Sequence, residues 1–242
     1  MASQDSSAIE LRCFLEKQGL LLEEAKTDLL YRYSKMLKEE GSKFNLTGIR
    51  EEREIWRKHL LDSLLLFFAL EVPHGARVVD IGTGAGLPGL VVKIYRPDLA
   101  LTLVDSNRKR LAFVERVIKE LGLEKVECET ARVEELGRDE GRRESFDLAL
   151  ARAVAELRVL VEYGLPLLKV GGKLAAYKGS QAEEEVERAR RALDLVGGEV
   201  EAIWRGRLPG VGEERKIVVI RKIVPTSPRW PRRVGIPAKR PL

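Results

Sequence analysis

Short β-branched segments alternate with amphipathic segments through the middle of this chain, and this alternation constrains its fold more than any other feature. The β-branched segments have the length of strands, and the segments between them place apolar residues three and four positions apart, as helices do. Because parallel strands need right-handed crossovers, the pattern predicts a doubly wound α/β sheet with helices on both faces. The predicted strands are residues 77–82, 99–105, 125–131, 146–151 and 172–178, and the predicted helices are residues 89–95, 108–121, 154–168 and 181–196.

The flanking segments follow other patterns. Residues 8–70 have helical spacing, which predicts a small helical region in front of the sheet. Residues 200–204 and 215–223 have strand character and are joined by a short Gly/Pro loop, which predicts an antiparallel edge strand on a mostly parallel sheet. We therefore expect three regions: a helical region at 1–72, a Rossmann-like domain at 73–223, and a basic, proline-rich tail at 224–242.

The net charge of the chain lies in this tail. The chain carries 43 basic and 38 acidic residues, and residues 224–242 hold five of the basic ones and none of the acidic ones. The net charge of +5 therefore belongs to the tail, which favours a polyanionic partner. The most apolar run, residues 60–70, is about half the ~20 residues of a membrane-spanning helix, and the first residues lack a signal-peptide pattern. We expect a cytoplasmic protein without a membrane anchor.

A glycine-rich turn follows the first predicted strand. Gly82, Gly84 and Gly86 allow backbone N–H groups to approach a ligand closely. Gly84, Gly86 and Gly89 also match the G-x-G-x-x-G pattern of dinucleotide-binding enzymes, so a nicotinamide cofactor is an alternative. Asp80 favours S-adenosylmethionine instead, because its carboxylate would repel a pyrophosphate but can pair with the ammonium of an amino-acid moiety.

The ends of the later predicted strands supply further polar groups. Asp105 ends the second strand, where a carboxylate can accept hydrogen bonds from both hydroxyls of a ribose. Backbone amides at 131–134 would lie beside an adenine ring, and Glu134 either contacts the ligand or stabilises a helix N-terminus. Arg152 ends the fourth strand, where it can pair with a cofactor carboxylate or a substrate phosphate, or form a structural salt bridge.

Other candidate residues lie outside this turn. His59 and Asp62 are one helical turn apart and could hydrogen-bond to each other or meet the glycine-rich turn, although a packing or capping role is favoured for them. With two histidines and two distant cysteines in the chain, no metal site is expected. Trp230 among arginines combines a stacking surface with cations, as in proteins that bind single-stranded RNA. The predicted RNA contacts are Lys178, Arg229, Trp230, Arg232, Arg233, Lys239 and Arg240.

Several motifs occur together over about residues 40–242. They are Phe44-Asn45-Leu46-Thr47, Lys58-His59-Leu60-Leu61-Asp62-Ser63-Leu64, the loop from Asp80 to Gly89, Arg132-Val133-Glu134, Arg152-Ala153-Val154-Ala155, and the tail from Pro231 to Leu242. In this combination the chain resembles the bacterial 16S ribosomal RNA guanine-N7 methyltransferase family, also called glucose-inhibited division protein B. The resemblance implies methyl transfer from S-adenosyl-L-methionine to N7 of guanine 527, in the 530 loop of 16S ribosomal RNA.

The residues and the resemblance together give a set of expected cofactor contacts. They are Asp80, Gly82, Gly84, Gly86, Leu87, Asp105, Ser106, Val133, Glu134 and Arg152. Guanine N7 carries a lone pair at neutral pH, so no general base is expected, and Arg152 is assigned to orientation because a cation against the base would oppose the developing positive charge.

The expected partner is 16S ribosomal RNA or the small ribosomal subunit, bound by a monomer. The alternatives are an S-adenosylmethionine-dependent methyltransferase for another substrate, and a non-catalytic RNA-binding factor for ribosome assembly.

Overall fold

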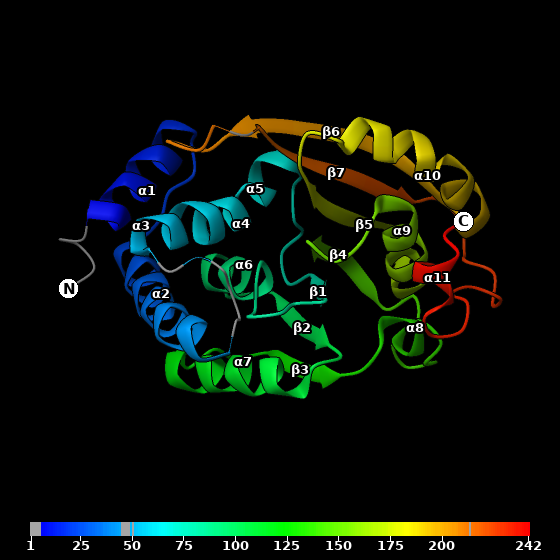
Figure 1. Ribbon diagram of the computed structural model, residues 1–242, viewed down its shortest axis with the longest axis horizontal. Coiled ribbons are helices and arrows are strands. Elements are labelled where there is room, and N and C mark those ends of the chain that lie inside the picture. The colour runs from blue at the N-terminus through cyan, green and yellow to red at the C-terminus, as the bar shows by residue number, and fades with distance from the viewer. Residues whose placement is uncertain (1–5, 45–48, 50, 213) are drawn as a thin grey trace.

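The predicted sheet is present in the structure, a computed structural model that describes residues 6–44, 49, 51–212 and 214–242. Its strands are β1 (Arg77–Ile81), β2 (Ala100–Asp105), β3 (Val126–Thr130), β4 (Phe146–Arg152), β5 (Leu168–Lys178), β6 (Gly198–Arg207) and β7 (Glu214–Lys222). Within the described residues these seven strands form one sheet, in the order β3-β2-β1-β4-β5-β7-β6 (Figure 1). The strands from β3 to β5 are parallel, and β7 runs antiparallel to both β5 and β6. The doubly wound fold with an antiparallel edge is therefore confirmed.

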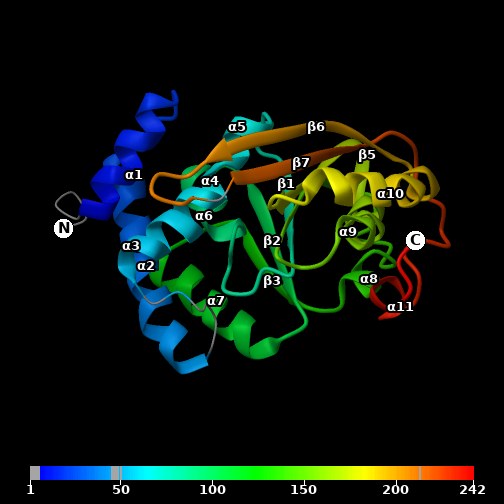
Figure 2. The same ribbon diagram turned by 45° about the horizontal axis from the view of Figure 1, so that its top comes forward.

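Helices cover both faces of this sheet (Figures 1 and 2). The helices before the sheet are α1 (Ser6–Lys17), α2 (Glu24–Phe44), α3 (Glu52–Ile55), the π-helix η2 (Trp56–Leu61), α4 (Asp62–Leu64) and α5 (Leu66–Ala69). The later helices are α6 (Gly89–Tyr95), α7 (Arg108–Leu121), α8 (Val133–Leu136), α9 (Leu157–Gly164), the 3₁₀ helix η3 (Leu165–Leu167), α10 (Ala182–Val196) and α11 (Ile236–Lys239).

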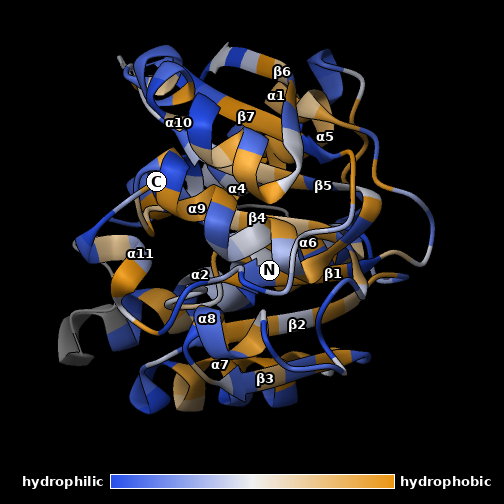
Figure 3. Ribbon diagram, turned by 90° about the vertical axis from the view of Figure 1, so that its right-hand side faces the viewer, coloured by the Kyte–Doolittle hydropathy of each residue, from blue (hydrophilic) through white to orange (hydrophobic). Residues whose placement is uncertain are grey.

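Two hydrophobic cores lie on opposite faces of the sheet, because successive strand residues point to opposite sides. In β1, Val78 belongs to the core that α6, α7 and the N-terminal helices cover. Val79 and Ile81 of the same strand point to the other side and belong to the core under α9 and α10. The central strands are accordingly hydrophobic almost throughout, whereas α7 and α10 carry alternating hydrophilic and hydrophobic bands (Figure 3).

The N-terminal helices share the first of these cores with the sheet. The buried Tyr33 hydroxyl of α2 donates a hydrogen bond to the Ala85 carbonyl oxygen at 2.6 Å, and the Tyr177 hydroxyl of β5 donates to the Ser63 carbonyl oxygen at 2.7 Å. Of the motif at 44–47, residues 45–47 lie outside the described residues. In the described part of the chain, no helix combines the length and apolar character needed to cross a membrane.

Element boundaries follow local chemistry. The Asn107 side chain caps α7 by accepting from the Lys109 backbone N–H at 3.0 Å, and the helix ends at Gly122, whose φ is +64°. The helix after β4 begins at Leu157, three residues later than predicted, because Glu156 is extended, with a ψ of 155° that a helix does not accommodate. Strand β5 begins at residue 168 rather than 172, since Leu168 already pairs with Phe146 ahead of the glycines.

The basic tail at 224–242 packs against the domain. Arg143 donates hydrogen bonds to the carbonyl oxygens of Thr226 and Trp230, at 2.5 and 2.8 Å, and Arg138 donates to that of Pro231 at 2.9 Å. Helix α11 lies beside α8 and α9 in both views (Figures 1 and 2). Despite its composition, the tail is an integral part of this face of the fold.

Candidate active site

The glycine-rich turn joins β1 to α6 and folds around two buried carboxylates. Gly84 has a φ of +59°, a conformation that L side chains rarely adopt, and its N–H donates to Asp105 Oδ2 at 2.9 Å. Gly89 begins α6 so close to the first strand that a Cβ there would lie 2.7 Å from Asp80 Oδ2. Glycine at these two positions is therefore required by φ in one case and by close packing in the other.

Asp80 lies beneath this turn and is 1% exposed. Its Oδ2 accepts hydrogen bonds from Thr83 Oγ1 at 2.6 Å and from the Gly89 N–H at 2.9 Å, while its buried Oδ1 has no partner. Burial raises the pKa of Asp80 to about 6, although both hydrogen bonds and the Arg152 guanidinium lower it. Asp80 lines neither of the cavities described below, and its observed hydrogen bonds hold the turn, while its ion pair with the cofactor stays a prediction.

Asp105 ends β2 on the other side of the turn and is 6% exposed. Its Oδ1 accepts from the Asn107 N–H at 2.8 Å and its Oδ2 from the Gly84 N–H, while Arg110 Nη1 lies 3.8 Å away. A carboxylate oxygen has two acceptor positions, so each Asp105 oxygen can take one further hydrogen bond. The side chain is therefore fixed in place while still able to accept from two ribose hydroxyls.

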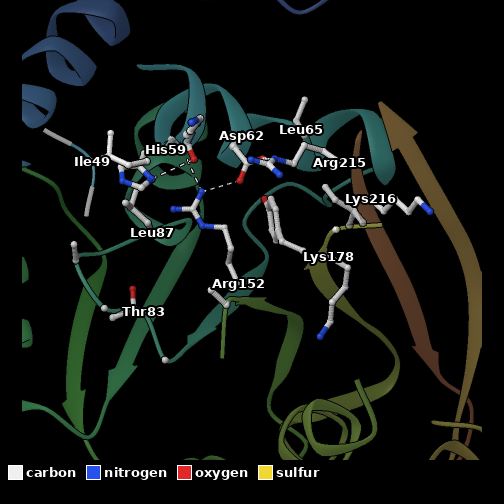
Figure 4. Close-up of a pocket in the computed structure, with 18 of the residues that line it drawn as sticks. Ile49, His59, Asp62, Leu65, Thr83, Leu87, Arg152, Lys178, Arg215 and Lys216 are labelled. Atoms are coloured by element: carbon white, nitrogen blue, oxygen red, sulfur yellow. Dashed lines mark hydrogen bonds and ion pairs between the residues drawn. The ribbon is translucent and has the colours of Figure 1, made fainter. Parts of the chain in front are cut away.

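Two cavities open at the carboxyl ends of the parallel strands, where ligands of open α/β sheets bind. The first has a volume of about 660 Å³ and lies between the glycine-rich turn, the η2–α4 segment and the neighbouring strands β5 and β7 (Figure 4). The second has a volume of about 300 Å³ and lies between β2, the β3–α8 turn, α9 and α11. Both are lined by Gly82, Arg110 and Ala153, so they adjoin each other.

The predicted cofactor contacts divide between these cavities. Gly82, Gly84, Leu87 and Arg152 line the first cavity. The second is lined by Gly82 again, together with Asp105, Ser106, Val133 and Glu134. Gly86, like Asp80, lines neither, because a Cβ at Gly86 would meet the Leu90 side chain inside the core.

Arg152 extends from the end of β4 into the first cavity, and its side chain is 14% exposed. Its Nη1 lies 3.0 Å from Asp62 Oδ2 and 3.3 Å from Ser63 Oγ, which ties the sheet to α4. Arg215 of β7 approaches the other oxygen of Asp62, with Nε 3.0 Å from Oδ1 (Figure 4). Arg152 is thus both a cavity residue and a member of a buried ion pair, which are the two roles that the sequence left open.

His59 and Asp62, for which the sequence favoured a packing or capping role, both line the first cavity. Burial, and then the nearby Arg152 cation, lowers the pKa of His59 to about 4, so the imidazole is neutral at physiological pH. Its Nδ1 lies 3.2 Å from the Lys58 carbonyl oxygen, and its Nε2 is buried without a partner. Their spacing of one helical turn gave the only signal, and that signal fits a packing role equally well.

Three of the predicted RNA contacts are paired or buried within the fold, although Lys178 also lines the first cavity, and RNA contact by them stays a prediction. Lys178 Nζ donates to the Ala155 carbonyl oxygen and to Glu185 Oε2, both at 2.7 Å. Trp230 is 8% exposed, so it offers no open face for stacking. Arg232 forms a bidentate pair with Glu162, whose exposure is 0%.

The other four predicted RNA contacts stay on the surface of the tail. The exposed tail cations, as we call them below, are Arg229, Arg233, Lys239 and Arg240. They lie on the segment that also carries Ala238, a residue that lines the second cavity.

Comparison with known proteins identifies the family. The family described as "GidB: rRNA small subunit methyltransferase G" matches residues 26–217. The chain belongs to this methyltransferase G family. One relative, the ribosomal RNA small subunit methyltransferase G of Moorella thermoacetica, is 47% identical over 232 residues, which cover 96% of this chain and 97% of that protein. That of Desulfitobacterium hafniense is 48% identical over 210 residues, 87% of each chain.

Solved structures support the methyltransferase fold of this family member. A SAM-dependent O-methyltransferase from Thermotoga maritima has a TM-score of 0.51 and 17% identity, covering 78% of this chain and 71% of that one. TrmN from Thermus thermophilus has a TM-score of 0.52 and 23% identity, covering 67% of this chain and 48% of that one. The resemblance seen in the sequence is thereby confirmed, both for the methyltransferase G family and for the fold.

Proposed function

We propose that this protein transfers a methyl group to N7 of guanine 527, in the 530 loop of 16S ribosomal RNA, and that it acts in the cytoplasm. The observation that carries this proposal is the 660 Å³ cavity beside the glycine-rich turn, in a chain of the methyltransferase G family. Its described lining includes the cations Lys58, Arg110, Arg152 and Arg215, which suit a substrate that brings phosphate groups into the cavity.

S-adenosyl-L-methionine is the methyl donor, and it supplies an electrophilic methyl group on a sulfonium. The second cavity suits its adenosine part, because Asp105 can accept from the ribose hydroxyls and residues 131–134 line the adjoining wall. Open space lies within 4 Å of where a Gly84 Cβ would be, apart from one backbone oxygen at 4.0 Å, so a ligand can approach this backbone closely. The residues present therefore fit the cofactor.

The ionisable groups of the first cavity suit an acceptor atom that has no proton to lose. His59, with its pKa lowered to about 4, is a weak base, and Asp62 is already flanked by Arg152 and Arg215. Guanine N7 needs only in-line placement, and positioning two reactants can contribute about 7–11 kcal/mol. Arg152, held by Asp62 and Ser63, is the residue that we assign to this orientation.

The proposal is tested by measuring tritium transfer from labelled S-adenosylmethionine to small subunits that lack the modification. Deproteinised 16S RNA and subunit assembly intermediates serve as parallel substrates. We expect transfer to at least one of the three, stoichiometric with RNA. Cofactor binding without transfer to any of them would instead favour a non-catalytic assembly factor or a methyltransferase for another substrate.

A further inference from the structure

The second cavity has one wall that comes from the end of the chain. Ala238 of α11 lines this cavity together with Asp105 and with Glu134 of α8. Glu134 is 4% exposed, and its Oε1 accepts a hydrogen bond from the Gly235 N–H at 2.8 Å. The tail therefore contacts a predicted cofactor residue directly and closes the cavity on that side.

The tail is held in this position by a buried ion pair. Glu162 of α9 has no exposed surface, and its Oε1 accepts from both the backbone N–H and the Nε of Arg232, at 2.8 and 2.9 Å. Arg232 Nη2 donates to Glu162 Oε2 at 2.6 Å, which completes a bidentate contact. Such a contact fixes direction as well as distance, and here it lies three residues before Gly235.

Further contacts hold the residues just before this pair. Pro231 packs against Gly137 so closely that a Cβ on Gly137 would lie 2.9 Å from Pro231 Cγ. Tyr163 also lines the second cavity, and burial, followed by the charges of Glu134 and Glu162, raises the pKa of Tyr163 to about 12. Its hydroxyl therefore stays protonated.

We propose that Arg232 and Glu162 are positioning residues for the cofactor, since they hold the tail as a wall of the cofactor cavity and thereby fix Glu134. This inference rests on the proposed placement of the adenosine part in the second cavity. It gives the tail an inner face that serves cofactor binding and an outer face that carries the exposed tail cations.

The test is a calorimetric titration of the full-length protein with S-adenosylmethionine in the absence of RNA. Arg232→Ala removes the pair but leaves the Glu162 carboxylate buried without a partner. The double variant Arg232→Ala/Glu162→Gln removes this carboxylate too, so it shows the effect of releasing the tail without that of an unpaired buried charge. We expect both to bind the cofactor roughly tenfold more weakly, the scale of one lost hydrogen bond to a charged group. Arg232→Lys, which keeps one charge but loses the bidentate contact, should lie between them and the unaltered protein.

Two controls separate positioning from general damage. Arg190→Ala removes an exposed pair with Glu187 on α10, 2.7 Å long, and should leave cofactor affinity unchanged. Gly137→Ala displaces Pro231 without altering any charge and should weaken cofactor binding in the same direction as Arg232→Ala. With saturating cofactor and RNA, turnover of the double variant should approach that of the unaltered protein, while its KM for cofactor stays raised.

Unchanged cofactor affinity in a folded double variant, with a thermal transition like that of the unaltered protein, would overturn the inference. A fall in turnover at saturating cofactor, with KM unchanged, would also overturn it. If the proposed function is wrong, the unaltered protein will bind S-adenosylmethionine but methylate no RNA. The cofactor affinities of the variants will then still show whether the tail positions the cofactor.

Discussion

The two cavities of the site are bounded by segments from before and after the parallel strands, and an arginine–carboxylate contact holds each segment in place. At the first cavity the arginine belongs to the sheet and the carboxylate to the helix before it, in Arg152–Asp62. At the second the carboxylate belongs to α9 and the arginine to the tail, in Arg232–Glu162. The two carboxylates also differ in the number of their ion-pair partners. Asp62 pairs with two arginines, whereas Glu162 pairs with Arg232 alone among the ion pairs of the described residues.

Because of this difference, the two pairs at the same edge of the sheet have different roles. The shared carboxylate at the first cavity keeps a cation beside the space for the substrate, so its pair contributes to orientation. The single pair at the second cavity is more deeply buried at its acid and fixes a wall, so it contributes to shape and stability. Removing each arginine should therefore have different consequences.

The largest expected effect is on stability. Arg232→Ala leaves Glu162 buried without its ion-pair partner and should lower the free energy of unfolding by about 3–5 kcal/mol. Arg152→Ala should cost clearly less, because Asp62 keeps Arg215. Urea denaturation of both variants measures the difference, and equal losses would contradict the distinction between a shared and a single pair.

Asp80 is a third buried carboxylate for comparison, and unlike Asp62 and Glu162 it has no arginine in contact. Its raised pKa means that the folded state favours the protonated form, so this stabilising contribution is complete below pH 3.8 and disappears as the pH rises to about 6. Relative to Asp80→Asn, the protein should lose about 2 kcal/mol of stability between pH 4 and pH 7. Denaturation curves across this range measure the loss, and a gain would contradict the assigned environment.

The next effect is on catalysis. Arg152→Ala should lower kcat about a hundredfold, because a misplaced reactant loses its near-attack geometry, while the fold persists. Methyl transfer under single-turnover conditions measures it. Arg158→Ala, which removes an exposed pair with Glu156 at 2.8 Å, provides the matched control, and full activity in the Arg152 variant would refute its role in orientation.

The smallest effect concerns the outer face of the tail. Each alanine substitution of an exposed tail cation that contacts phosphate should reduce the log–log salt slope of RNA binding by about 0.7. Filter binding over a series of salt concentrations measures the slope. Deleting residues 224–242 would also remove Arg232 from Glu162, so point substitutions test the outer face without opening the second cavity. Unaltered slopes in all four variants would exclude RNA contact by these cations.

Local patterns made most of the sheet and part of the site predictable. The glycines lie in the turn between β1 and α6, and Asp105 lies at the end of β2. Their positions therefore follow from the alternation of strands and helices along the sequence. Asp62, His59 and Arg215 could not be placed in this way, because they reach the first cavity from segments far apart in the sequence. The packing of the tail was not predictable, because prolines and arginines are typical of exposed segments. The partner of Arg232, the buried Glu162, lies far away in the sequence and is brought to the tail only by the fold.

The proposed reaction is methylation of guanine N7 in the small-subunit RNA. The most direct measurement is aniline cleavage of 16S RNA after incubation of unmodified small subunits with the protein and S-adenosylmethionine, since aniline breaks the chain at N7-methylguanine. We expect a single new break in the 530 loop, which is absent without cofactor. Incorporated label with no break there would place the methyl group on another atom or another nucleotide and would contradict the account.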